Sequence, residues 1–506
     1  MEEEKNGFFG KIKKKLRGGA ATDSIILTFV KFVTMAIGLV ITKLLSTQFS
    51  KADYGTYSQA MQVATTVTSF AILGLTNATS YYYNKTTDSE LKKKYVSTIF
   101  GLEYIVGFIG AVLIMALNLP IALYFGNENV RPLLWFVAFM PLMANLINML
   151  QVLFVSVGKA KVIAIRNLIV SLSKLAAVTV ACFVTKSVII ILITTLSLEI
   201  IQVVYFMLAF KKHDFAVLPK IMWNHVPEIL KFCLPMAVYV LSNSLMRDID
   251  KYVIGFFANE EVFAVYHNAS KVLPFDLMTT AFATVLVPII TRQINSDRKH
   301  EATTAYREYL RFGYLTTWIL TFGAAVSAKP LMLLLYSANY LEGLPVFILY
   351  LVVEMIRFAN ISTVLSASGK TVKLMFVSVG ALAINAALDI PAYILIDKAY
   401  PGRGMIGPAA VTVFITLLMC ITLITMGKKE LSAHWKELFN FKEILLILGE
   451  LFVVGAGCVV LGYFLEKWGL HYLLRLIITY GLFVGIVGGV NFKKIMGSLK
   501  RINQLK

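Results

Sequence analysis

Long apolar runs separated by short polar breaks fill almost the whole chain. Most runs reach the roughly 20 residues that a helix needs to cross a bilayer. We expect about fourteen transmembrane helices, near 22–47, 54–82, 95–118, 130–156, 160–184, 188–211, 227–257, 262–291, 310–329, 343–366, 371–396, 404–427, 443–466 and 471–492. The pattern predicts an all-α polytopic membrane protein.

Residues 227–292 interrupt this pattern with charges inside two apolar runs that a short acidic hairpin joins. The polar residues of the two runs are Arg247, Asp248, Asp250, Lys251, His267, Asn268, Lys271 and Asp276. A charge near the bilayer centre costs roughly 2.5–3.5 kcal/mol, so such residues usually face a protein interior or a wet cavity. Arg247 and Lys271 lie at a similar distance from the hairpin, so they should reach a similar depth. We interpret the hairpin as one wall of a partly cationic cavity; the alternative is that its charges pair with each other or reach the outer surface.

Other charged residues also fall inside predicted helices. Lys31 and Lys43 lie in the first run, Glu354 in the tenth and Asp389 in the eleventh. Asp389 shares a helix face with Asn385, four residues earlier. Glu354 could instead form a local ion pair within its own helix, and Asn side chains often join membrane helices rather than bind ligands.

The chain contains an internal repeat. Tyr57 matches Tyr266, Pro120 matches Pro330, and the motif around Gly158 matches the one around Gly369, all at an offset of about 210 residues. These matches indicate two homologous halves of six helices each. Because six is an even number, both halves enter the membrane from the same side, as a parallel repeat with the last two helices added afterwards.

The repeat and the polar breaks predict the domain organisation. In chain order we expect a basic amphipathic N-terminus, a first lobe, a linker, a second lobe, a second linker, two final helices and a basic tail. Their ranges are 1–21, 22–211, 212–226, 227–427, 428–442, 443–492 and 493–506.

Composition agrees with a membrane protein. The chain is 58% hydrophobic and 15% charged, whereas soluble proteins carry about 25% charged residues. Its net charge of +19 does not indicate nucleic-acid binding, because most Lys and Arg lie in alternate loops. That asymmetry is the positive-inside pattern of a chain with both termini in the cytoplasm.

No enzymatic motif survives inspection. Gly369-Lys370-Thr371 resembles the end of a phosphate-binding loop, but Val364 stands where that loop needs glycine. Asp248 and Asp250 have the spacing of a sugar-nucleotide transferase motif, yet they lie inside a predicted helix. The four cysteines fall in apolar runs without ligand spacing. We therefore expect no enzyme, no cofactor and no metal site, and transport becomes the default function.

Two segments at equivalent places in the halves resemble a known family. SNSLMRDIDKYVIGFFANEEVFAVYHNASKVL resembles the seventh-to-eighth helix signature of polysaccharide flippases, and STQFSKADYGTYSQAMQV followed by LGLTNATSYYY resembles their first-to-second helix signature. These flippases belong to the multidrug/oligosaccharidyl-lipid/polysaccharide exporter superfamily. The chain departs from the pattern at Ala264, where glycine is usual, and at Thr47-Gln48, where a basic residue is usual.

The resemblance implies alternating access of two lobes that carry undecaprenyl-pyrophosphate-linked oligosaccharide to the outer leaflet of the bacterial cytoplasmic membrane. On that reading Arg247, Lys271, Lys31 and Lys43 contact the pyrophosphate, because Lys and Arg offset its buried charge. Asp250, Asp276, Glu354 and Asp389 couple an ion such as H⁺ or Na⁺, or hold the cations in place. We expect a monomer that works with a polysaccharide polymerase and a chain-length regulator.

Three alternatives remain open. A multidrug or cation antiporter of the same superfamily would favour an acidic cavity and generally has twelve helices. A peptidoglycan lipid-precursor flippase would carry a related substrate, but the first helix matches that branch weakly. A membrane glycosyltransferase or polymerase, from a different class of protein, would need a large outer loop, which this sequence lacks.

Overall fold

The computed structural model describes residues 20–504 except 72–73, 86–87, 157–159, 212–219, 272, 274, 276 and 360. Four parts of the sequence prediction therefore lie wholly or largely outside the described residues. They are the amphipathic segment within 1–21, most of the first linker (212–226), the motif around Gly158 and the candidate Asp276.

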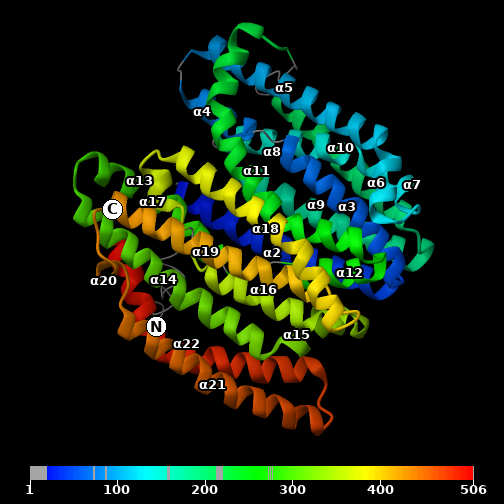
Figure 1. Cartoon of the computed structure of the whole chain (residues 1–506). Helices are drawn as coiled ribbons and strands as arrows, with labels where there is room; N and C mark the ends of the chain where they lie inside the picture. The colour runs from blue at the N-terminus through cyan, green and yellow to red at the C-terminus, as the bar shows by residue number, and fades with distance from the viewer. Residues whose placement is uncertain are drawn as a thin grey trace, which may run out of the picture. The chain divides into compact units, whose positions relative to one another are not determined.

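All regular secondary structure in the described part of the chain is helical (Figure 1). The α-helices are α2 (Ala20–Gln48), α3 (Lys51–Ala71), α4 (Leu75–Lys85), α5 (Ser89–Ala116), α6 (Asn118–Phe125), α7 (Val130–Val137), α8 (Met140–Ser156), α9 (Ala160–Val180), α10 (Val188–Lys211), α11 (Val226–Phe257), α12 (Glu260–Ala269), α13 (Leu277–Asn295), α14 (Lys299–Val326), α15 (Ala328–Leu335), α16 (Leu344–Ile356), α17 (Thr363–Ala367), α18 (Thr371–Ala399), α19 (Ile406–Glu430), α20 (Trp435–Leu438), α21 (Phe441–Lys467) and α22 (Tyr472–Gln504). Helices suit a bilayer because they satisfy their own backbone hydrogen bonds.

The predicted class, an all-α polytopic membrane protein, is confirmed. Among the described residues, ten helices are long and apolar enough to span a bilayer, or eleven if α14 and α15, bent by 86°, form one broken span. The expected count of about fourteen is not confirmed, because some predicted spans are divided into shorter helices.

Two predicted spans are each divided into two helices. The predicted span 262–291 consists of α12 and α13, so Lys271 lies in the break between them and not within a continuous helix. Pro274 follows in the sequence, and proline disfavours helix at the residue before it. The predicted span 54–82 likewise consists of α3 and α4, separated near Gly74, whose positive φ of 72° favours glycine.

The sequence repeat reappears in the helix boundaries. α5 and α14 each have 28 residues, and α6 and α15 each have 8. In each pair the second helix begins about 210 residues after the first. Equivalent elements follow in the same order in both halves, as a repeat requires.

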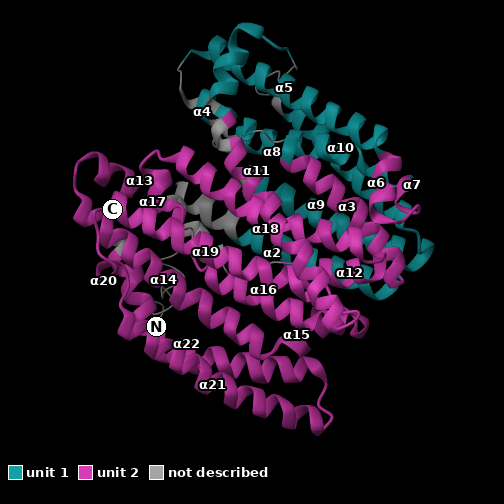
Figure 2. Cartoon of the chain, in the orientation of Figure 1, with its two compact units in different colours: residues 1–49, 70–117, 132–233 teal, residues 50–69, 118–131, 234–506 magenta. Residues whose placement is uncertain are grey.

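The chain forms two compact units (Figure 2). Unit 1 comprises residues 1–49, 70–117 and 132–233, and unit 2 comprises residues 50–69, 118–131 and 234–506. The core of unit 1 joins α4, α5, α8 and α10 through residues such as Phe100, Leu150 and Phe206. The larger core of unit 2 centres on α14, where Tyr306 and Leu310 are fully buried.

α14 also carries the two last helices of the chain. It packs against both α21 and α22, and Phe322 stacks on Phe483 at 5.8 Å between ring centroids. Gly323 allows this approach, because a Cβ there would lie 2.9 Å from the Phe483 ring. The hydroxyl groups of Ser327 and Thr479 form a buried hydrogen bond of 2.8 Å.

Candidate functional site

Asp250 is a fully buried carboxylate held by three hydrogen-bond donors. Tyr266 on α12 donates its hydroxyl to Oδ2 at 2.6 Å, and Tyr350 on α16 donates to the same oxygen. The backbone N–H of Lys251 donates to Oδ1 at 2.8 Å. Hydrogen bonds to an ionised oxygen are about twice as strong as neutral ones, so this arrangement stabilises a negative charge among apolar helices.

Asp389 on α18 is a second buried carboxylate of a different kind. Both of its oxygens lack a hydrogen-bond partner among the described residues, and so do both polar atoms of Asn385, one turn earlier. α11 and α18 lie side by side, since Asn243 donates to Ser378 at 3.1 Å and Phe257 stacks on Tyr393 at 5.1 Å between ring centroids, so Asp250 and Asp389 lie on neighbouring helices. Leaving a buried polar group without a partner costs about 1–3 kcal/mol. Buried groups left in this state are therefore candidates for a functional role.

Thr412 lies on α19, the helix that packs against α18. α18 and α19 pack closely, since a Cβ at Gly407 would lie 2.4 Å from the carbonyl oxygen of Ala392. Because the two helices are joined by a short connection and run in opposite directions, Thr412 lies near the level of Asp389. Its hydroxyl is buried and has no partner among the described residues.

Lys271 follows the end of α12 and is partly buried. Its ammonium donates to Asn268 Oδ1 at 3.3 Å and to the Tyr54 hydroxyl at 3.4 Å. Tyr54 on α3 in turn donates to Asn268 Oδ1 at 2.8 Å. Tyr54, which is far away in the sequence, therefore helps to position the Lys271 ammonium group.

The close approach of α3 to α12 depends on Gly55. A Cβ at this position would lie 2.0 Å from the carbonyl oxygen of Glu260. No side chain fits at that distance, so glycine is required for Tyr54, its neighbour, to reach Asn268.

Arg247 is exposed on α11, while its neighbours make local contacts. Lys251 forms an ion pair with Asp248 at 2.5 Å, which is the pairing that the sequence left open as an alternative. Asn243 donates to Ser378 on α18 at 3.1 Å. Thus the charges of Asp248 and Lys251 balance each other within α11.

The remaining candidates lie in different places. Glu354 is buried on α16, one turn after Tyr350. Lys31 is exposed and Lys43 is half-buried, both on α2 in unit 1, whereas Arg247 belongs to unit 2.

Sequence reasoning missed Tyr54, Tyr350 and Thr412 as polar residues of the candidate site. Tyr54 carries a signal, because it lies next to Gly55 within one of the repeated motifs. Tyr350 lies four residues before Glu354, on the same face of its helix. A hydroxyl group inside an apolar run predicts a polar site less clearly than a charged group does, and no other feature of the sequence points to Thr412.

A family described as polysaccharide biosynthesis protein matches residues 40–345. A probable lipid II flippase MurJ of Rickettsia prowazekii (strain Madrid E) is 23% identical over 248 residues, 45% of this chain and 47% of that protein. The chain thus aligns with about half the length of that relative.

Solved structures share the fold at low identity. A lipid II flippase MurJ in an inward closed conformation aligns with a TM-score of 0.67 and 17% identity, covering 91% of this chain and 98% of that one. An inward-facing multidrug resistance MATE family transporter of the MOP superfamily aligns with a TM-score of 0.64 and 12% identity, covering 81% and 98%.

Fold and apolar helices together define a multi-pass membrane protein with the architecture of MOP-superfamily transporters. Since the family match covers more than half of the chain, the protein belongs to the polysaccharide biosynthesis protein family. The resemblance expected from the two repeated signatures is confirmed.

Proposed function

We propose that the protein is a flippase that moves undecaprenyl-pyrophosphate-linked oligosaccharide from the inner to the outer leaflet of the bacterial cytoplasmic membrane. The observation that carries the proposal is that Asp250, Asp389 and Lys271 lie buried or half-buried among apolar helices of unit 2. Charges in membrane helices are costly and usually functional. Membership of a polysaccharide biosynthesis family supports a glycan substrate.

The proposed substrate contacts are cationic. Arg247 is exposed on α11, and Lys271 lies beside the α3–α12 contact. With Lys31 and Lys43 they would offset the pyrophosphate charge, which otherwise costs several kcal/mol per ion to bury. The lipid tail stays in the bilayer, so only the head group needs this protection.

Asp389, Asn385 and Thr412 supply the proposed coupling site. Their oxygens have no hydrogen-bond partner among the described residues, and carboxylate, amide and hydroxyl oxygens bind H⁺ or small cations such as Na⁺. Asp250, with its tyrosine donors on α12 and α16, would support this site. Occupation of this site would then bias the alternating access of the two repeats.

A peptidoglycan lipid precursor is the second candidate substrate. It is favoured by the relative named as a probable lipid II flippase and by the shared fold. Both substrates carry a polyprenyl pyrophosphate and differ in the attached sugars. A polymerase and a chain-length regulator would be partners only if the substrate is an oligosaccharide repeat unit.

The test combines depletion with reconstitution. Depletion should cause lipid-linked oligosaccharide to accumulate in the inner leaflet while lipid II remains normal; the reverse pattern would assign the second candidate. In proteoliposomes, Arg247→Ala and Lys271→Ala should slow flipping of a lipid-linked glycan. Arg131→Ala is a matched control, because Arg131 is an exposed cation of unit 2 that pairs with Glu128. Wild-type rates in both variants would contradict the site.

A further inference from the structure

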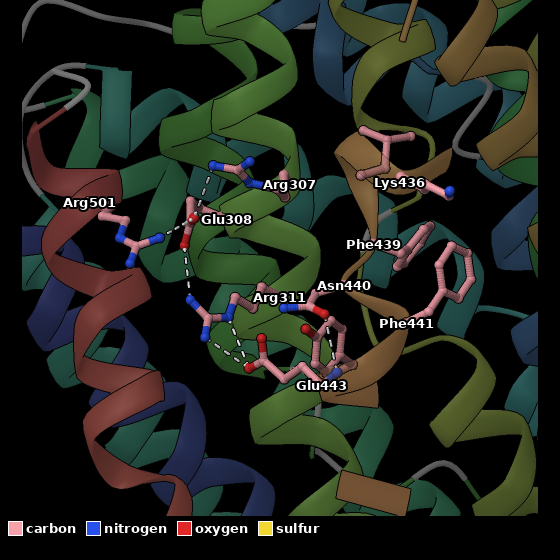
Figure 3. A pocket seen from close by; sticks show the side chains of 11 residues that line it. Arg307, Glu308, Arg311, Lys436, Phe439, Asn440, Phe441, Glu443 and Arg501 are labelled. Atoms are coloured by element: carbon pink, nitrogen blue, oxygen red, sulfur yellow. Dashed lines mark hydrogen bonds and ion pairs between the residues drawn. The ribbon is translucent and has the colours of Figure 1, made fainter. Parts of the chain in front are cut away.

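A pocket of about 660 Å³ opens beside the middle turns of α14, and none of the residues proposed to bind substrate or ion lines it (Figure 3). α14, α22 and the segment from α20 to the first turn of α21 form its walls. The side chains that line it are Arg307, Glu308, Arg311, Tyr314, Lys436, Leu438, Phe439, Asn440, Phe441, Glu443 and Arg501.

Two carboxylates organise the cations of this pocket. The Glu308 side chain is 1% exposed, and Arg501 on α22 donates to it at 2.9 Å, while Arg307 lies 3.6 Å away. Arg311 lies 3.9 Å from Glu308 and donates from Nε and Nη2 to Glu443 at 3.0 and 2.9 Å. The arginines are therefore fixed in position before any ligand arrives.

The pocket keeps an excess of positive charge. Four cationic side chains and two carboxylates line it, so two positive charges are not balanced within it. The Arg307 and Arg501 side chains remain 41% and 56% exposed. A guanidinium has five N–H donors, and those not used by Glu308 can bind phosphate oxygens.

One wall of the pocket is apolar and continues along α21. Figure 3 shows Phe439 and Phe441 across the pocket from Arg501. Phe441 is 56% exposed, and the same face of α21 continues through Leu445 at 73% and Phe452 at 63%. A ligand with a charged head and long apolar chains fits these two surfaces better than a soluble anion does.

We propose that this pocket binds the phosphodiester head group of an anionic membrane phospholipid, whose acyl chains lie along α21. Basic pockets between membrane helices are suited to such head groups. With the expected topology, the pocket faces the cytoplasmic leaflet, because the C-terminal end of α22 contributes Arg501. The proposal does not depend on the identity of the transported substrate.

The test measures lipid binding to the full-length protein. Native mass spectrometry would count lipids bound from phosphatidylglycerol, with phosphatidylcholine as the neutral comparison. Arg307→Gln together with Arg501→Gln should weaken phosphatidylglycerol binding by about tenfold or more, since charge-assisted hydrogen bonds are lost. Arg298→Gln is the control, because Arg298 immediately precedes α14, is 49% exposed and pairs with Glu301 outside the pocket.

A further variant separates binding from folding. Lys436 lines the pocket and is exposed on α20, so Lys436→Gln should weaken phosphatidylglycerol binding without altering thermal stability. Equal binding of phosphatidylglycerol and phosphatidylcholine would overturn the proposal. So would unchanged binding in all pocket variants, or a pocket that takes only inorganic pyrophosphate or only a polyprenyl pyrophosphate lipid.

Discussion

Gly55 offers a sharp test of the contact between α3 and α12. A Cβ at this position would lie 2.0 Å from the Glu260 carbonyl oxygen, whereas ordinary contact begins at 3.4 Å. Gly55→Ala therefore forces the two backbones apart by roughly 1 Å or more. Overpacking of this kind destabilises a protein by about 1–3 kcal/mol.

The same displacement should reach the candidate site. Tyr54 would move away from Asn268 and Lys271, to which it is now bonded at 2.8 and 3.4 Å. A shift of about 1 Å can reduce the rate of a positioned reaction by up to 100-fold, so we expect the flipping rate to fall at least tenfold. The assays are flipping of a lipid-linked glycan in proteoliposomes and the midpoint of thermal unfolding in detergent.

Gly380→Ala provides the control. Gly380 lies within α18, and no atom lies within 4 Å of a Cβ placed there. Alanine also favours helix over glycine by about 1 kcal/mol, so this variant should be as stable as the wild type or more so. If Gly55→Ala behaved like Gly380→Ala in both assays, the steric reasoning would be wrong.

Substitutions at three positions test the polar residues of the candidate site. Asp389→Asn should abolish the response of transport to a Na⁺ or H⁺ gradient while the protein stays folded; an unchanged response would exclude Asp389 as the coupling residue. Tyr350→Phe removes one donor to Asp250 and should lower stability by about 1.5–3 kcal/mol, measured by thermal unfolding; an unchanged midpoint would show that this hydrogen bond contributes little. Lys271→Gln should slow flipping by roughly tenfold or more, and Lys271→Arg should restore part of the rate; equal loss in both would indicate a structural role.

The repeat and the helical class could be predicted because they depend on local pattern. Pro120 and Pro330 occupy equivalent positions in α6 and α15, so a few matched residues were enough to predict equivalent helices. Hydropathy did not reveal the breaks after α3 and α12, because averaging over about 20 residues conceals a single turn of altered backbone. Gly74 and Pro274 lie near these breaks in the sequence, but a single glycine or proline does not by itself predict that an apolar run is divided.

The candidate site was predicted only in part, because charged residues are visible in a sequence and their partners are not. Tyr54 and Asn268 are 214 residues apart, and Arg501 and Glu308 are 193 apart. Nothing in the local pattern pairs them, since the pairing is set by how α3 meets α12 and how α22 meets α14. The lipid pocket was missed for the same reason.

The position of Glu308 makes the C-terminal helix pair indispensable to the bundle that precedes it. A shortened chain ending after α19 would lose Arg501 and Glu443 together and expose the ring of Phe322. Glu308 would then keep only the longer ion pairs with Arg307 and Arg311 on its own helix, at 3.6 and 3.9 Å, so the shortened bundle should be less stable. A chain shortened in this way should therefore need new partners for Glu308 and Arg311.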